Sequence, residues 1–198
     1  MKHAVILAHP RGRSFVRLLA ETYAAAAQAL GHKAELIDLY AEGFDPRLQA
    51  EEIPGADAGQ PGPDVAALRE RLADVDVFAF CYPIWFGGPP AILKGFVDRV
   101  FTAGFGYESI KGGGLHPLLE GRKLISFTAS GSENQWLVES GGWDAVRVAF
   151  DRRLAGATGM TVLEHVNFGG VDADLDPARV QEAVDGVRKV VTDLFQPE

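Results

Sequence analysis

The sequence contains 198 residues, of which 47% are hydrophobic and 23% carry a charge. Both proportions are typical of a soluble globular protein and exclude a disordered or collagen-like chain. Lys and Arg total 19 against 27 Asp and Glu, which gives a formal net charge of -8. This acidic balance argues against a protein that binds nucleic acid by neutralising phosphates, and against a basic membrane-surface protein. The length suits a single domain, which we expect to span residues 1–198.

Short apolar runs alternate with amphipathic patterns along the chain, and each kind of pattern predicts one kind of element. Continuous apolar runs are typical of buried strands, whereas apolar side chains three and four residues apart are typical of one helix face. In chain order, the predicted elements are a strand at 4–8, a helix at 14–30, a strand at 33–39, a loop at 53–63, a helix at 65–72, a strand at 75–81, a helix at 89–101, an irregular stretch at 104–120, a strand at 123–128, a helix at 143–154, a strand at 160–168 and a helix at 176–194.

Five strands that each precede a helix predict an α/β fold with one parallel sheet covered by helices on both faces. In such a doubly wound sheet, ligands bind beyond the carboxyl ends of the strands, near the topological switch point. We therefore expect the loops after the first, third and fourth strands to carry the function.

The cysteine count and the hydropathy pattern bound where the protein works. Cys81 is the one cysteine of the sequence, so neither an intrachain disulfide nor a cysteine-based zinc site is expected. No pair of histidines has the spacing of metal ligands, and we expect no metal site. The apolar runs are far shorter than the roughly 20 residues that span a bilayer, and residues 4–8 are too short for a signal peptide. The expectation is a cytoplasmic protein without membrane insertion.

The loop after the first strand ends where a helix is expected to begin. The free N–H groups and the dipole of a helix N-terminus favour an anion, and Arg11, Arg13 and the Ser14 hydroxyl add hydrogen-bond donors. Such a loop suits a phosphate or a diphosphate. The alternative is a plain capped helix, in which Ser14 is the N-cap.

The other two loops have different compositions. Residues 82–90 gather large aromatic side chains, which suit the wall of a site for a flat aromatic ligand, or else a packed loop or a subunit contact. Residues 128–136 hold small side chains that let backbone N–H groups approach a ligand edge, unless they form an ordinary polar loop. A phosphate cradle, an aromatic wall and close backbone donors at one sheet edge together suit a flavin better than a simple phosphate.

One segment of the chain has a highly specific sequence, which runs Tyr82-Pro-Ile-Trp-Phe-Gly-Gly-Pro-Pro-Ala-Ile-Leu-Lys-Gly-Phe-Val-Asp-Arg-Val-Phe. It is accompanied by His9 with Ser14-Phe15, by Phe44-Asp45-Pro46 and by Gly104-Phe105-Gly106-Tyr107. On these residues the chain resembles, over nearly its whole length, the NAD(P)H quinone oxidoreductases, the DT-diaphorase-like family. The resemblance implies a flavodoxin-like three-layer sandwich. It also implies a homodimer with one flavin per subunit and active sites at the dimer interface.

The resemblance also implies which residues hold the flavin. The diphosphate and ribityl loop would consist of His9, Arg13, Ser14 and Phe15. The wall of the isoalloxazine ring would consist of Pro83, Ile84, Trp85 and Phe86. The loop along the pyrimidine edge would contain Thr128, Ser130 and Gly131. Arg179 falls where FAD-using members hold the adenylate end. Asp98 falls where a carboxylate of the neighbouring subunit reaches the adenine side. The last two residues favour FAD, with FMN as the second choice.

The chain departs from the family pattern at positions near the flavin. Gly87 stands where an aromatic residue is frequent, and Trp136 replaces a tyrosine. Gly142 falls near the position of a histidine, so the Tyr–His proton relay of the family is missing. We expect backbone N–H groups of Ser130 and Gly131 to stabilise charge on the reduced flavin instead.

These residues together predict an enzyme, a flavin-dependent NAD(P)H:quinone oxidoreductase that reduces quinones or similar flat electrophiles by two-electron hydride transfer with ping-pong kinetics. Trp136 and Tyr107 are candidate substrate-pocket residues, and no catalytic residue is assigned. NAD(P)H and the quinone are the expected small-molecule partners. The alternatives are a flavin-binding ancillary subunit of a potassium-efflux system and a one-electron carrier like a flavodoxin.

Overall fold

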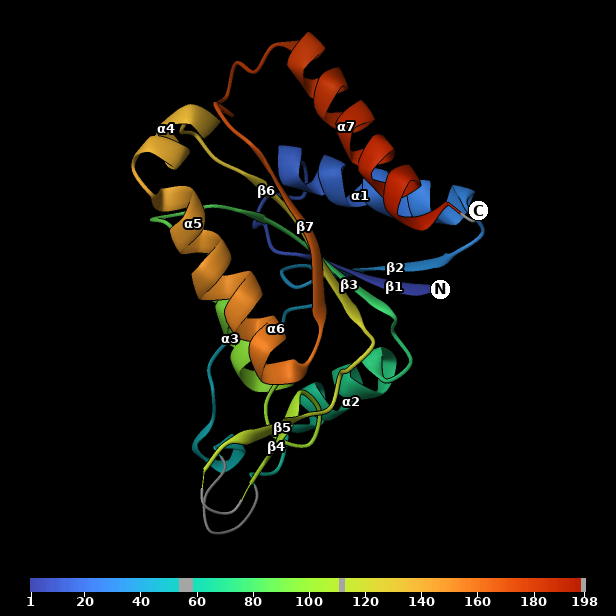
Figure 1. Ribbon diagram of the computed structural model, residues 1–198, viewed down its shortest axis with the longest axis vertical. Coiled ribbons are helices and arrows are strands. Elements are labelled where there is room, and N and C mark those ends of the chain that lie inside the picture. The colour runs from blue at the N-terminus through green and yellow to red at the C-terminus, as the bar shows by residue number, and fades with distance from the viewer. Residues whose placement is uncertain (54–58, 111–112, 197–198) are drawn as a thin grey trace.

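The computed structural model describes residues 1–53, 59–110 and 113–196. Its centre is a sheet of five strands in the order β2-β1-β3-β6-β7 (Figure 1). The strands are β1 (Lys2–Leu7), β2 (Lys33–Asp38), β3 (Val77–Pro83), β6 (Lys123–Ala129) and β7 (Thr161–Phe168). Every neighbouring pair in this sheet is parallel. The predicted five-stranded parallel sheet is therefore confirmed.

Helices cover both faces of this sheet (Figure 1). α1 (Phe15–Ala29) and α7 (Pro177–Phe195) pack together over one face. The opposite face carries α2 (Pro63–Leu72), α3 (Ala91–Val100) and a helical run that ends in α6 (Arg153–Thr158). The three-layer α/β sandwich predicted from the sequence is confirmed. None of the helices in the described part of the chain combines the length and the apolarity needed to cross a membrane.

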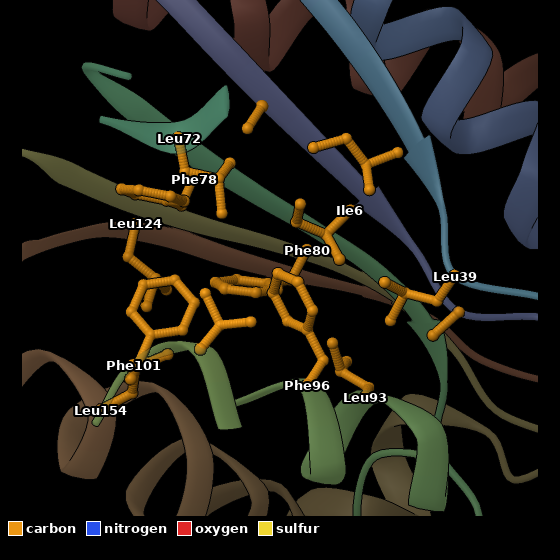
Figure 2. Packing of buried hydrophobic residues seen from close by; sticks show 14 of the residues in the cluster. Ile6, Leu39, Leu72, Phe78, Phe80, Leu93, Phe96, Phe101, Leu124 and Leu154 are labelled. Carbon is orange, nitrogen blue, oxygen red and sulfur yellow. The ribbon is translucent and has the colours of Figure 1, made fainter. Parts of the chain in front are cut away.

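The core beneath α2, α3 and α6 is rich in phenylalanine (Figure 2). Phe78 of β3 meets Phe101 edge to face, with 5.2 Å between the ring centroids, and Phe96 of α3 meets Phe101 at 5.9 Å. Burial of each such ring contributes roughly 1.5–3 kcal/mol. This packing fixes α3 against β3 and so holds the loop between them at the edge of the sheet.

The stretch 104–120, which the sequence predicted to be irregular, contains a small second sheet. β4 (Tyr107–Ser109) and β5 (Leu115–Pro117) form an antiparallel pair in which Tyr107 lies opposite Pro117. Strands of three residues are too short to show the alternation of apolar and polar residues on which the prediction depended. A short 3-10 turn, η1 (Ala50–Glu52), precedes α2.

The single helix predicted at 143–154 is interrupted. The chain instead forms α4 (Asn134–Glu139), α5 (Gly142–Arg147), a π-helical turn η2 (Val148–Arg152), and then α6. Gly141 separates α4 from α5 because its φ of 74° lies in the left-handed region, which glycine adopts at little cost. In the wider π turn, both Phe150 and Asp151 are buried.

Candidate functional site

Four loops meet at the carboxyl-terminal edge of the sheet. The strand register aligns them, since Leu7 pairs with Cys81 and Tyr82 pairs with Thr128. Together they enclose a cavity of about 280 Å³. It is lined by His9, Arg11, Arg13, Ser14, Phe15 and Val16 after β1, by Pro83, Ile84 and Trp85 at the end of β3, by Ala129, Ser130 and Gly131 at the end of β6, and by Val171, Asp172 and Ala173 after β7.

Three of these loops were predicted from the sequence, and the fourth was missed. Residues 171–173 follow β7, so the rule that ligands bind beyond the strand ends applies to them as well. Their composition, Val-Asp-Ala, contains no aromatic, cationic or glycine residue that would have drawn attention to them. Their place in the cavity follows from the pairing of β6 with β7, in which Ala129 lies opposite Phe168.

The first loop presents positive charge to the cavity. Ser14 is the N-cap of α1, because its hydroxyl accepts a hydrogen bond from the Arg17 N–H at 3.1 Å. The Arg17 guanidinium pairs with Asp38 at the end of β2. Arg11 and Arg13 are exposed at the rim. The capped helix is confirmed, and the cap orders a helix N-terminus at the cavity, where free N–H groups and the dipole favour an anion.

His9 contributes a neutral ring to the same loop. Burial lowers the pKa of His9, and the charges of Arg11 and Arg17 lower it further. The His9 Nδ1 accepts a hydrogen bond from the Arg11 N–H at 3.1 Å. The ring proton of neutral His9 therefore resides on Nε2, where it is a hydrogen-bond donor at the cavity.

The second loop is a tight turn that displays two aromatic rings. Trp85 and Gly88 exchange backbone hydrogen bonds of 2.9 and 3.1 Å, and the two residues between them, Phe86 and Gly87, have φ values of 49° and 74°. Positive φ at both central positions defines a turn in which glycine fits and a β-carbon is strained. The turn explains why glycine stands at position 87. It leaves the Phe86 side chain fully exposed beside the cavity, and the Trp85 ring 6.0 Å from the His9 ring.

The third loop offers fewer backbone donors than the sequence suggested. The Ser130 N–H donates to the Phe168 carbonyl oxygen at 3.0 Å, so the expectation that it is available to a ligand is wrong. The Ser130 carbonyl oxygen in turn accepts from the Val171 N–H at 2.9 Å. Gly131 lines the cavity, and a β-carbon there would meet only the Val171 carbonyl oxygen, at 3.9 Å. The loop is therefore open to a ligand edge at Gly131 rather than at Ser130.

Thr128 lies below the cavity and not in its lining. Its side chain is completely buried, and its hydroxyl lies 3.0 Å from Nε2 of His165 and 2.9 Å from Oδ1 of Asn167. The family resemblance implied that it lies along the ligand edge, together with Ser130 and Gly131. The alternation of side chains along β6 turns the Thr128 side chain instead toward the sheet face that carries η2 and α6.

Arg179 lies at a second cavity, of about 260 Å³, which shares Phe15 and Val171 with the first. Its guanidinium donates to the Gly169 carbonyl oxygen at 2.8 Å and lies 3.6 Å from the Glu133 carboxylate. Glu182 adds a second carboxylate to the lining. The charge of Arg179 is therefore partly compensated by its own chain.

The two candidate substrate-pocket residues lie away from the first cavity. Trp136 is on α4, and 58% of its surface is exposed. Tyr107 lines a separate, mostly apolar cavity of about 390 Å³ together with Asp98, whose carboxylate pairs with Lys94. Within the residues that the structure describes, neither aromatic side chain is brought into the lining of the first cavity.

The residues of the first cavity fit a flavin. Its two arginines and the N-terminus of α1 suit a phosphate, and Trp85 presents flat apolar surface, whereas the exposed Phe86 ring lies outside the lining. Gly131 leaves room for an edge that seeks backbone hydrogen bonds. The volume of about 280 Å³ lies just below the range of about 300–1,000 Å³ that is typical of cofactor pockets. The adjoining second cavity extends it.

Comparisons with known proteins agree with this architecture. A family model described as "Flavodoxin-like fold" matches residues 1–191. An uncharacterized NAD(P)H oxidoreductase of Haemophilus influenzae is 32% identical over 180 residues, which cover 90% of this chain and 89% of that protein. An NAD(P)H dehydrogenase [quinone] 1 of Cavia porcellus is 30% identical over 67% of this chain, but the match spans only 54% of that enzyme.

Solved structures show the same likeness in three dimensions. An NAD(P)H:quinone oxidoreductase from Methanothermobacter marburgensis superposes with a TM-score of 0.85 and 28% identity, covering 98% of this chain and 99% of that one. The family match over nearly the whole chain and the 32% identity to the Haemophilus protein together show to which family the chain belongs. The chain belongs to the flavodoxin-like family, in which its relatives include proteins named as NAD(P)H oxidoreductases and quinone dehydrogenases.

Proposed function

We propose that residues 1–198 form one flavin-binding domain and that the protein is an NAD(P)H:quinone oxidoreductase. One observation carries the proposal, which is the convergence of a cationic helix N-terminus, an aromatic turn and a small-residue loop on one cavity. The names of the relatives in Haemophilus, Cavia and Methanothermobacter support the same activity. A bound flavin supplies the two-electron chemistry that links NAD(P)H oxidation to quinone reduction.

Each part of the cavity has a distinct role in this proposal. Arg11, Arg13 and the N-terminus of α1 bind the phosphate, because all of them present N–H donors and positive charge. Trp85 bounds the flat ring system and keeps water from its face. The Gly131 N–H is a donor for the edge of that ring system, where negative charge develops.

The second cavity supports FMN over FAD, although Arg179 led us to expect FAD from the sequence. The Arg179 guanidinium is held by the Gly169 carbonyl oxygen and the Glu133 carboxylate. Glu133 and Glu182 bring two negative charges to the cavity that an adenylate would enter. A second phosphate group near these carboxylates would be repelled, whereas FMN carries a single phosphate, which the cationic loop of the first cavity can bind.

Exposed aromatic side chains on the turn after β3 and on α4 support a homodimer. Trp85, Phe86 and Trp136 are exposed in the single chain, and an isolated subunit gains nothing from such rings in water. A second copy that covers them would complete the wall of the cavity. In that arrangement, Tyr107 or Asp98 of one subunit would reach the site of the other, as the family resemblance implies.

The absorption spectrum of the purified protein tests the proposal first, with chromatography of any flavin released by acid. We expect flavin absorption and released FMN. A steady-state assay with NADH or NADPH and a quinone then tests turnover, for which parallel double-reciprocal lines are expected. A colourless protein that binds neither added FMN nor added FAD would refute the proposal. A protein that binds flavin but reduces no quinone would favour the role of an ancillary subunit.

A matched pair of arginine variants tests the assignment of the phosphate site. Arg13→Ala is expected to weaken FMN binding by about 10- to 100-fold, which corresponds to the loss of one charge-assisted hydrogen bond of roughly 1.5–3 kcal/mol. Arg188→Ala is the control, because Arg188 is an exposed arginine on α7 that pairs with Asp185. Equal FMN affinity in both variants would contradict the assignment.

A further inference from the structure

A row of polar side chains lies inside the protein beneath the candidate flavin cavity. On β6, Ser126 and Thr128 are fully buried and alternate with apolar residues that face α1 and α7. Ser126 and Thr128 lie on the opposite face of the sheet, toward η2. Figure 1 shows the helical run from α5 to α6 alongside β6 and β7. Asp151 of η2 and His165 of β7 are also buried, at 1% and 5% exposure. Buried polar groups are costly unless they are bonded, so their arrangement invites an explanation.

Hydrogen bonds join these side chains into one continuous path. Asp151 is bonded to Nδ1 of His165 at 2.5 Å, and Nε2 of His165 lies 3.0 Å from the Thr128 hydroxyl. The hydroxyl is 2.9 Å from Oδ1 of Asn167, whose Nδ2 donates to the Ser130 hydroxyl at 2.9 Å. Ser130 lines the cavity. The path therefore runs from the π turn to the third loop of the site.

The directions of these bonds determine where the protons lie. Nδ2 of Asn134 donates to the backbone oxygen of Asn167 at 3.1 Å, and this bond fixes the orientation of the Asn134 amide. Oδ1 of Asn134 therefore accepts from Nδ2 of Asn167 at 2.7 Å. Oδ1 of Asn167 then accepts the proton of the Thr128 hydroxyl at 2.9 Å, a proton that the Val166 carbonyl oxygen shares at 3.4 Å. The Thr128 oxygen can only accept from the histidine, so Nε2 of His165 carries a proton. Asp151 accepts from the Ser126 hydroxyl at one carboxylate oxygen and faces Nδ1 of His165 with the other at 2.5 Å, an arrangement in which the carboxylate is the acceptor and Nδ1 is the donor.

We propose that His165 carries both ring protons and faces an ionised Asp151 inside the protein. Through Thr128 and Asn167, this buried pair positions Ser130 at the edge of the candidate flavin cavity. Neither member of the pair lines the cavity, so both are positioning residues. The positioning role rests on the proposed flavin site, whereas the protonation of His165 is independent of it.

The other groups around the pair are compatible with this charge distribution. The Ser126 hydroxyl donates to the second carboxylate oxygen of Asp151 at 2.8 Å. Burial raises the pKa of Tyr82, whose ring lies 6.1 Å from the His165 ring, so Tyr82 stays neutral. Arg147, Arg152 and Glu164 share a cavity of about 330 Å³ with the pair on its outer side. The Trp143 ring covers the imidazole edge to face, with 4.8 Å between the centroids.

Nitrogen NMR of the histidine rings in the purified full chain tests the protonation. At pH 7, both ring nitrogens of His165 are expected to show the shifts and the attached-proton couplings of protonated nitrogen. The His165→Gln variant identifies the signals by their loss. An Nε2 without a proton at pH 7 would overturn the proposal, because Thr128 would then have to turn its proton away from Asn167.

Amide hydrogen exchange tests the coupling to the loop. Asp151→Asn keeps the side-chain shape but removes the anion, and exchange of the Ser130 N–H is expected to accelerate by about tenfold while the Val187 N–H in α7 exchanges as before. Asp144→Asn, at an exposed carboxylate on α5, is the matched control with no change. Thr128→Val should behave like Asp151→Asn, and Thr128→Ser should restore slow exchange. Unchanged exchange at Ser130 in both Asp151→Asn and Thr128→Val would overturn the positioning role.

FMN titration separates this inference from the proposed function. If the wild-type protein binds FMN, Asp151→Asn is expected to bind it about tenfold more weakly, and Asp144→Asn equally well. Equal binding by Asp151→Asn would overturn the positioning role, even with the His165 protons in place. If the wild-type protein binds no flavin, the proposed function fails, while the NMR and exchange results still decide whether the pair holds the loop.

Discussion

The stability of this fold should depend on pH through a histidine remote from the candidate site. His3 of β1 is completely buried, with its ring nitrogens 2.8 Å from the Tyr23 hydroxyl and 2.9 Å from Nδ1 of His32. The Phe195 ring packs against it edge to face at 4.8 Å. Burial, the nearby His32 and the N-terminal charge lower the pKa of His3 from 6.5 to about 4.

The direction of this shift sets the direction of the pH effect. The unfolded chain binds a proton at His3 below pH 6.5, but the folded protein does so only near pH 4. The stabilising contribution of neutral His3 is therefore complete above pH 6.5 and is lost progressively as the pH falls toward 4. At about 1.4 kcal/mol for each pH unit, the loss amounts to about 3 kcal/mol. Glu52 acts at lower pH, because hydrogen bonds from Arg99 lower its pKa to about 2.

Urea unfolding of the wild type and His3→Gln at several pH values between 4 and 8 measures this contribution. Glutamine keeps hydrogen-bonding groups near Tyr23 but does not titrate. The free energy of unfolding of the wild type should fall by about 3 kcal/mol more than that of His3→Gln over this range. His116→Gln, at an exposed histidine of β5, should follow the wild type. Parallel profiles for the wild type and His3→Gln would refute the reasoning.

Four further substitutions have expected effects on stability, each measured by urea or thermal unfolding. Gly95→Ala should destabilise the protein by roughly 1–3 kcal/mol, because a β-carbon at this position would lie 2.2 Å from the Pro46 carbonyl oxygen. Gly156→Ala in α6 should stabilise the protein by about 0.5–1 kcal/mol, because its β-carbon would meet open space. Glu52→Gln should cost about 3 kcal/mol, since it removes the buried counter-charge of the Arg99 guanidinium and leaves only the half-exposed Asp64. Ser14→Ala should cost about 1 kcal/mol through loss of the helix cap. A Gly95→Ala variant as stable as Gly156→Ala would contradict the close approach of α3 to Pro46, and an unchanged stability of Glu52→Gln would contradict the buried ion pair of Glu52 with Arg99.

The fold was largely predictable because its strands are buried on both faces. Every residue of β3 is buried, so the apolar run at 75–81 could not have been a half-exposed strand or a loop. Short elements were not predictable in this way. β4 and β5 have three residues each, and the π turn η2 arises within a helical pattern whose sequence contains neither glycine nor proline. Such features depend on packing against the rest of the protein rather than on local periodicity.

The site was predictable to the extent that it follows from strand ends. The loops after β1, β3 and β6 could be named because the carboxyl ends of parallel strands share one edge. The orientation of single side chains within those loops could not be named. Thr128 is turned inward by the alternation along β6, and the bond between Asp151 and His165 joins residues from two elements. These contacts are set by strand register and helix position, which a single sequence does not specify.

Phe86 places folding and activity under opposing demands. Its left-handed backbone costs a residue with a β-carbon roughly 1–2 kcal/mol, and its exposed ring recovers none of that cost within the single chain. A library of variants selected only for survival at high temperature should therefore accumulate glycine or asparagine at this position. A library selected for turnover should retain an aromatic residue. Position 86 can thus report which of the two pressures a laboratory selection has applied.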